Sequence, residues 1–251
     1  MGTVDIKKFY DLLAGEYDSM TSFEQRLIKD ESSYRSLVKK YNIKTALDAG
    51  AGTGAHSILL AQTGVEVTAV DISREMLKLL SLHAKDKIVK IKTIKSDFLD
   101  LSNKVRQKFD AVFCMGNSLA HAKTRSELRK TLSNFHSLLK PNGTLFIQIL
   151  NYDKIILNKE MIQSIKESKG KIFIRFYGFV NDKIDFHLLT IERKDGNLNH
   201  NIITTHLRPI RHIIIHKLLK GAGFKYVKFS SHLDDGKFNK QKSNDLFIKA
   251  C

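Results

Sequence analysis

The sequence predicts a doubly wound α/β fold, in which helices cover both faces of a parallel sheet. From residue 45 to residue 150, short apolar runs alternate with segments of helical periodicity, and this alternation is typical of right-handed β-α-β units. A glycine-rich turn follows the first apolar run, at the end of the strand where such folds bind ligands. The chain has 251 residues, of which 42% are hydrophobic, so it is long enough to bury one large core.

The limits of the predicted helices and strands follow from changes in the hydrophobic periodicity and from residues that favour turns. Residues 6–40 alternate apolar and charged side chains at helical spacing, which predicts two or three N-terminal helices. A short helix or turn is expected after the third strand, and Pro141 and Gly143 mark a turn before the fifth. The predicted strands lie at 45–49, 66–71, 88–97, 109–115 and 144–150, and the predicted helices between them at 54–62, 74–83 and 124–139.

The pattern changes after residue 150. Residues 153–166 have helical spacing, and three segments rich in β-branched and aromatic residues follow, with turn signals at 181–182 and 195–196. We expect these three strands to be antiparallel and to cap one end of the sheet, although a plain packing layer is an alternative. The three strands lie at 171–180, 183–193 and 200–210; a helix at 211–219 and a hairpin of 224–231 with 244–250 close the chain.

Charge and composition indicate which kinds of binding partner the protein is expected to have. The 42 Lys and Arg residues exceed the 26 Asp and Glu residues and give a formal charge of +16, which attracts nucleic acid. Because 32 of these cations are Lys, dispersed along the chain, a solvated basic surface is favoured and nucleic acid is the less favoured partner. No apolar run is long enough to span a membrane, so we expect a cytoplasmic protein without a membrane partner, either a monomer or a homodimer.

Metal binding is not predicted. Cys114 and Cys251 lie far apart and have neither the spacing of a zinc site nor that of a disulfide framework. His212 and His216 are four residues apart on a predicted helix, a spacing that can bind a metal, but no glutamate of an HExxH motif lies between them.

The glycine-rich turn carries the first chemical signal. Gly50, Gly52 and Gly54 follow the first strand, where missing side chains let the backbone approach a ligand and the next helix offers free N–H groups. Asp48 lies two residues before the turn, and Asp71 ends the next strand 21 residues after Gly50. An acid at that place can accept hydrogen bonds from both hydroxyls of a ribose. The ligand is therefore predicted to contain ribose, as a dinucleotide or a sulfonium nucleoside.

Five motifs in order resemble those of class I S-adenosylmethionine-dependent methyltransferases, and the resemblance runs from about Tyr10 to the C-terminus. The resemblance implies an enzyme with a Rossmann-like sheet of seven strands in the order 3-2-1-4-5-7-6, whose seventh strand is antiparallel. The motifs are ALDAGAGTG at 46–54, AVDIS at 69–73, KSDFLD at 95–100, FDAVFCMGNS at 109–118 and LLKPNGTLFIQ at 138–148.

The resemblance also implies how S-adenosylmethionine binds and leaves as S-adenosylhomocysteine. Asp71 would accept hydrogen bonds from the ribose hydroxyls, and Asp97 would accept one from the adenine amino group. Phe98 would face the adenine ring. The implied cofactor-binding residues are Tyr17, Asp48, Gly50, Ala51, Gly52, Asp71, Ile72, Met76, Asp97, Phe98, Met115 and Asn117. The aromatic residues Tyr10, Tyr17 and Phe23 are expected either to cover this site or to pack between helices.

With this function, four parts of the chain can be assigned. The expected parts are an N-terminal helical lid at 1–44, the cofactor-binding α/β core at 45–152, an inserted helix and antiparallel strands as a substrate cap at 153–209, and a helix and hairpin that complete the core sheet at 210–251.

Two further segments resemble the glycine and sarcosine N-methyltransferase group: MGNSLAH at 115–121 and NYD at 151–153. The resemblance implies that Asn117 and Tyr152 position the acceptor, within a pocket that also includes Asn151 and the inserted strands. His121 is interpreted as a capping or surface residue. That group has an arginine, which pairs with the substrate carboxylate, where this chain has Leu150, so free glycine is not favoured as the acceptor. A cation elsewhere could compensate, and the candidates are Arg175, Arg193 and Arg208.

The predicted function is therefore transfer of a methyl group to a small molecule, with an amine nitrogen favoured. The chain lacks the Pro-Pro motif that is usual in enzymes that methylate base amines, since the fourth strand leads into Gly-Asn-Ser-Leu. No strong general base is evident. Two alternatives stay open: an RNA or protein methyltransferase that docks through its basic face, and a binding module that holds the cofactor without catalysis.

Overall fold

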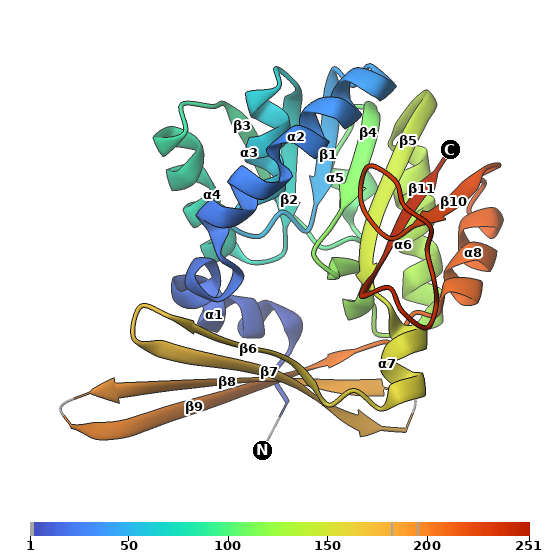
Figure 1. Cartoon of the computed structure of the whole chain (residues 1–251). Coiled ribbons are helices and arrows are strands. Elements are labelled where there is room, and N and C mark those ends of the chain that lie inside the picture. Colours follow the sequence, from blue (N-terminus) through green and yellow to red (C-terminus); the bar gives the residue numbers. More distant parts are fainter. Residues whose placement is uncertain (1–2, 182, 195) are drawn as a thin grey trace.

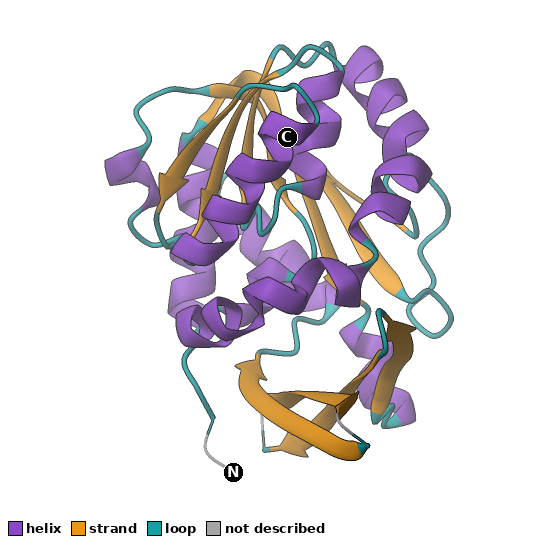
Figure 2. Ribbon diagram, turned by 90° about the vertical axis from the view of Figure 1, so that its left-hand side faces the viewer, coloured by secondary structure: helices purple, strands orange, loops and turns teal. Residues whose placement is uncertain are grey.

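The computed structural model describes residues 3–181, 183–194 and 196–251 and contains two sheets. A seven-stranded core sheet has helices on both faces, and a four-stranded antiparallel sheet lies beyond the end of the core sheet, with helix α1 (Ile6–Thr21) between the two (Figures 1 and 2). We refer to the smaller sheet, β6 to β9, as the inserted sheet.

The core sheet confirms the predicted fold class. Its strand order is β3-β2-β1-β4-β5-β11-β10, which is the order 3-2-1-4-5-7-6 when only these strands are counted. The first five strands are parallel, and β11 is antiparallel to both β5 and β10. The strands are β1 (Thr45–Ala49), β2 (Glu66–Asp71), β3 (Ile91–Lys95), β4 (Phe109–Cys114), β5 (Leu139–Leu150), β10 (Val227–Ser230) and β11 (Asp245–Ala250).

Two apolar layers hold the helices on this sheet. On one face, Phe113 and Phe146 of the sheet stack at 4.9 Å between centroids and pack with Tyr34 and Ile58. On the other face, Phe109 and Leu145 pack against Leu132 and Phe135. The helices of the first face are α2 (Phe23–Tyr41), α3 (Ala55–Gln62) and α4 (Arg74–Asp86), and those of the second are α5 (Leu101–Lys104), α6 (Arg125–Ser137) and α8 (His212–Gly221).

Helix α1 leaves the core and packs on the inserted sheet. The chain turns between α1 and α2 at Ser22, whose φ of +58° lies in the left-handed region. Phe9 and Leu13 are buried against Phe173 and Leu188 of the inserted sheet. This arrangement leaves the opposite side of α1 facing the carboxyl ends of the core strands.

The inserted sheet has four strands, so the prediction of three strands preceded by a helix over 153–166 is wrong. Helix α7 (Tyr152–Asn158) ends where Lys159 adopts a positive φ of 48°. The residues that follow pair with the next strand through a two-residue turn at Lys169 and Gly170, both with positive φ, as a tight hairpin requires. The strands are β6 (Ile162–Ser168), β7 (Lys171–Val180), β8 (Lys183–Lys194) and β9 (Asn197–Leu207).

Strands β7, β8 and β9 agree with the three predicted strands to within a few residues. The two turns expected between them involve Asp182 and Asp195, which lie outside the described residues.

The turn after β1 should tolerate a side chain poorly. Gly54 has φ of +96°, and a Cβ atom there would lie 2.6 Å from Cγ of Leu80. We expect Gly54→Ala to lower the free energy of unfolding by about 2–5 kcal/mol, because it combines left-handed strain with a clash in the core. Gly64 has a similar φ of +85° and open space around it, so Gly64→Ala should cost only about 1–2 kcal/mol.

Urea unfolding of both variants and the wild type would measure the difference. Equal losses for the two variants would show that Leu80 does not restrict the turn.

Candidate functional site

A cavity lies at the carboxyl ends of β1 to β4, under helix α1. It encloses about 990 Å³, including volume that is open to solvent. Seven of the residues that the sequence predicted for cofactor binding line it, together with Tyr10 of the expected lid. These seven are Tyr17, Gly50, Gly52, Asp71, Ile72, Asp97 and Phe98.

The glycine turn forms the floor of the cavity. Gly50 and Ala51 donate their backbone N–H groups to the carbonyl of Val70, at 2.8 and 3.0 Å, which ties the turn to β2. Gly50 has φ of +81°, and a Cβ there would lie 2.6 Å from Oγ of Ser118. The ring of Tyr17 lies over Gly52, 3.8 Å from where a Cβ would be. Only glycine therefore keeps the backbone open to the cavity at this floor.

Asp71 joins the end of β2 to this turn. Its Oδ2 accepts the backbone N–H of Gly52 at 2.8 Å, and its Oδ1 accepts that of Ser73 at 2.8 Å. Burial raises the pKa of Asp71, although the backbone N–H groups of Ser73 and Gly52 act in the opposite direction. A carboxylate has about four acceptor positions, so Asp71 can still accept hydrogen bonds from a ligand in the cavity that it lines.

Other predicted cofactor-binding residues lie behind this wall. Ala51, Met76 and Met115 are buried in the core. Asp48 is also buried; its Oδ2 accepts from Oγ of Ser57 at 2.6 Å, and its Oδ1 has no partner among the described residues. Burial raises the pKa of Asp48 to about 6.

Asn117 and Tyr152, predicted to position the acceptor, are brought together. Asn117 follows β4 with φ of +66°, and its Nδ2 donates to Oη of Tyr152 at 2.9 Å. Its Oδ1 accepts the backbone N–H of Leu150 at 3.1 Å, so the pair links the ends of β4 and β5. Burial raises the pKa of Tyr152 well above its usual range, and the side chain stays a neutral phenol. Neither residue belongs to the cavity lining.

His121 lines the cavity, contrary to its interpretation as a capping or surface residue. Its Nε2 lies 2.9 Å from Oη of Tyr10, and its Nδ1 has no partner among the described side chains. Burial lowers the pKa of His121 to about 4, so the imidazole is neutral at physiological pH and is a weak base there. Sequence spacing gave no sign of this pair, because 111 residues separate its members.

The sequence also missed a buried network next to the glycine turn. Nη2 of Arg26 lies 2.8 Å from Nε2 of His56, and Nδ1 of His56 lies 2.6 Å from Oη of Tyr34. Burial lowers the pKa of His56 well below its usual range, so Nε2 accepts from Arg26 while Nδ1–H donates to Tyr34. The network therefore fixes a guanidinium group beside α3.

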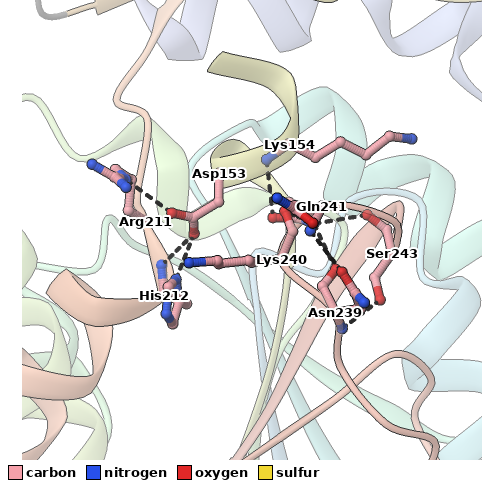
Figure 3. A network of polar contacts seen from close by, with 9 residues as sticks. Asp153, Lys154, Arg211, His212, Asn239, Lys240, Gln241 and Ser243 are labelled. Atoms are coloured by element: carbon pink, nitrogen blue, oxygen red, sulfur yellow. Dashed lines mark hydrogen bonds and ion pairs between the residues drawn. The ribbon is translucent and has the colours of Figure 1, made fainter. Parts of the chain in front are cut away.

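Asn151 and Asp153 belong to a different part of the fold, where Figure 3 labels Asp153 beside Arg211 and His212. Nδ2 of Asn151 donates to the carbonyls of Lys240 and Ser243 at 3.1 and 2.8 Å. Asp153 accepts from Nε of Arg211 and from both the backbone N–H and Nδ1 of His212, at 2.8 to 2.9 Å. Asn151 thus holds the loop before β11, whereas the sequence was interpreted as placing it in the acceptor pocket.

We expect Asn151→Ala to lower the free energy of unfolding by about 1–3 kcal/mol, because it removes the buried amide that donates to the carbonyls of this loop. Cofactor binding should change little, since Asn151 lies outside the cavity. Chemical denaturation and calorimetry with S-adenosylhomocysteine would measure the two quantities. Asn199 is exposed on β9 and provides the control, Asn199→Ala, with a loss under about 0.5 kcal/mol. A stability equal to that of the control would contradict the assigned role.

No group of three or more histidine, cysteine or acidic residues within the described ranges could hold a metal ion. The Nδ1 atom of His212 contacts Asp153 instead. Among the described residues, no helix is both long and apolar enough to cross a membrane.

Comparison with known proteins gives consistent results. Residues 46–143 match a family model described as a methyltransferase domain. A glycine/sarcosine N-methyltransferase of Aphanothece halophytica is 36% identical over 141 residues, covering 56% of this chain and 53% of that protein. One from Parasynechococcus marenigrum (strain WH8102) is 25% identical over 224 residues, covering 88% and 77%.

A solved structure of an S-adenosylmethionine-dependent methyltransferase from Clostridium acetobutylicum ATCC 824 has the same fold. It aligns with a TM-score of 0.81 and 18% identity over 96% of this chain and 98% of that one.

The matched family model identifies a methyltransferase domain at residues 46–143, and the core sheet has the strand order that the resemblance to class I S-adenosylmethionine-dependent methyltransferases implies. Several of the curated proteins that the chain resembles are glycine/sarcosine N-methyltransferases. The chain spans about half the length of most of the first curated relatives it matches.

Proposed function

We propose that the protein transfers the methyl group of S-adenosylmethionine to an amine nitrogen of a small molecule. The observation that carries this proposal is the cavity at the carboxyl ends of β1 to β4, which has a glycine floor, an acid at the end of β2 and an aromatic cover from α1. This is the place where a parallel sheet binds nucleotide-like ligands.

The lining fits the cofactor along its length. Asp71 would accept hydrogen bonds from the ribose hydroxyls, and Asp97 would accept one from the adenine amino group. Ile72 and Phe98 would contact the faces of the adenine ring. Tyr17 covers Gly52, where its ring suits the sulfonium cation. Asp48, Ala51, Met76 and Met115 would support the cofactor site from behind, and the unpartnered Oδ1 of Asp48 gives it a free acceptor.

The cofactor supplies an already activated methyl group, so the protein mainly has to orient the acceptor and exclude water. Asn117 and Tyr152 form a rigid pair at the ends of β4 and β5, beside which the amine would approach. The nitrogen must reach the methyl group as the neutral amine with its lone pair free, and the proton that it loses after transfer passes to solvent. His121 is neutral at physiological pH and lies in the cavity wall with Tyr10; its lowered pKa makes it a weak base, so it would act as a hydrogen-bonding group. The aromatic rings of α1 shield the site from solvent.

Removing the acid of β2 should weaken cofactor binding. Asp71→Ala is expected to reduce affinity for S-adenosylhomocysteine by about 1–3 kcal/mol, since ribose hydroxyls lose a charge-assisted partner. Asp86 is exposed on α4, so Asp86→Ala should bind like the wild type. Isothermal calorimetry, with unfolding curves to verify the fold of each variant, would test this. Tight binding of NAD, or an unchanged affinity in Asp71→Ala, would contradict the cofactor assignment.

The class of acceptor can be tested without knowing its identity. The protein would be incubated with cofactor labelled in the methyl group and with a cell extract separated into small molecules, RNA and protein. We expect label in the small-molecule fraction, because the lysines are dispersed along the chain. Label in RNA, with sub-micromolar and salt-sensitive RNA affinity, would favour a nucleic-acid methyltransferase instead. Cofactor binding without any label transfer would favour a non-catalytic module.

A further inference from the structure

The inserted sheet has two faces, and the described residues cover only one of them. The inner face carries α1, against which Phe173 and Leu188 are buried. Figures 1 and 2 show α1 and the core on that side of the sheet and no described helix over the opposite side, which we call the outer face. An antiparallel sheet with one face in water normally places apolar residues inside and polar residues outside.

The outer face departs from this alternation, because a row of aliphatic side chains crosses all four strands. Ile174 of β7 pairs with Ile165 of β6 on one side and with Leu189 of β8 on the other. Leu189 pairs in turn with Ile202 of β9. Ile174 follows the inward-facing Phe173, and successive side chains of a strand alternate between the faces, so the whole row points outward.

The rows on either side of this central row are also apolar in the two middle strands. On one side Ile172 pairs with Ile191. On the other side Phe176 stacks on His187, with 4.7 Å between the ring centroids. The three apolar residues and the central row belong to none of the apolar clusters found among the described residues. They form a contiguous apolar surface, of the kind that marks an interaction site.

The middle of the outer face contains no lysine or arginine, although the chain has 42 of them and a formal charge of +16. The polar positions in these three rows are Glu167, His187, His200 and Thr204. Faces that bind anionic membranes combine apolar residues with Lys and Arg, so this composition argues against a lipid surface. It favours a partner surface without cations, and a second copy of this chain offers one at the same face.

Two opposite charges lie at equal distances from the middle of β8. Asp185 precedes Leu189 by four residues and Arg193 follows it by four, so both point outward. Asp185 is paired with His206, whereas Arg193 takes part in no ion pair or hydrogen bond found within the described ranges. A twofold axis that crosses the strands at Leu189 would place Arg193 of each copy over Asp185 of the other. The charges at the ends of the face are therefore complementary to themselves.

The size of the outer face is sufficient for a stable dimer. Its strands have 7, 10, 12 and 11 residues. Four strands about 4.8 Å apart, with about 3.3 Å per residue, give a footprint of roughly 600 Å². Two such faces would bury about 1,200 Å² or more, which reaches the range of specific protein interfaces.

We propose that the outer face of the inserted sheet is the interface of a homodimer, in which two inserted sheets pack face to face as a β-sandwich. The central aliphatic row forms the dry middle of this interface, and the contacts of Arg193 with Asp185 of the other copy close its two ends. Because α1 and the cavity lie on the inner side, each copy keeps its own ligand site, directed away from the partner. The inference does not depend on the identity of the methyl acceptor.

The oligomeric state of the wild type is the first test. Sedimentation velocity from about 1 to 100 μM should show a species of twice the chain mass, in an equilibrium that depends on concentration. A monomer at every concentration would overturn the proposal. A monomer that binds vesicles containing phosphatidylglycerol would overturn it as well, because a lipid surface would then cover the face.

A charge in the middle of the face should separate the copies. Leu189→Glu places two carboxylates against each other and should weaken the dimer by about 100-fold or more. Leu82 is 62% exposed on α4, so Leu82→Glu is the matched control and should dimerise like the wild type. Neither residue lines the cavity, so affinity for S-adenosylhomocysteine per chain should stay the same in both variants. A dimer that survives Leu189→Glu uses another surface, and the proposal is then wrong.

Reversal of the end charges tests how the copies are aligned and leaves the apolar row intact, so it remains decisive if Leu189→Glu fails to fold. Arg193→Glu and Asp185→Arg should each weaken the dimer by about 10-fold, because each creates like charges between the copies. The double variant, Arg193→Glu with Asp185→Arg, should recover most of the wild-type affinity. A double variant that dimerises no more tightly than either single variant would overturn the proposal.

Discussion

The attachment of the glycine turn to β2 is the constraint on which the rest of the site depends. Gly50 and Ala51 bond to the carbonyl of Val70, and Gly52 bonds to the carboxylate of Asp71. These contacts fix the floor of the cavity and orient the acid with the same set of hydrogen bonds. The floor cannot shift without moving the acid, and neither can shift without disturbing the first three residues of the turn. Glycine is required because the backbone has positive φ and Ser118 lies against it.

A second constraint is that one helix serves two sheets. Helix α1 buries Phe9 and Leu13 against the inserted sheet, while Tyr10 and Tyr17 line the cavity over the core sheet. The aromatic residues that the sequence left between two interpretations, cover or packing, are thus divided: Tyr10 and Tyr17 reach the cavity, whereas Phe23 is buried with α2 and α3. The cavity is complete only because the inserted sheet supports this helix from below, so residues far from the glycine turn still shape the ligand site.

The core sheet and the cavity floor were predictable because their signals are local. Strand and helix periods, positive-φ glycines and acids at strand ends are all encoded within short segments. Strand β6 was not predictable, since Ile162 and Ile165 also have the spacing of a helix and pairing with β7 decides between the two. The contacts of Tyr10 with His121 and of Arg26 with His56 join residues far apart in the sequence, so the hydrophobic periodicity does not indicate them. Asn151 was misassigned for the same reason, because its partners lie about 90 residues away in the C-terminal loop.

The contact of Lys166 with the end of α1 has a mechanical consequence. Nζ of Lys166 donates to the carbonyls of Ser19 and Met20, which fastens the carboxyl end of the helix to β6. Helix α1 is therefore tied to the inserted sheet at its carboxyl end as well as through the apolar contacts of Phe9 and Leu13. The inserted sheet is in turn packed on the core, because Tyr177, Ile184 and Leu207 belong to the same apolar cluster as residues of β4 and β5. The helix that covers the cavity is thus held from the inserted sheet, and its place over the glycine turn depends on residues of β6 that do not line the cavity.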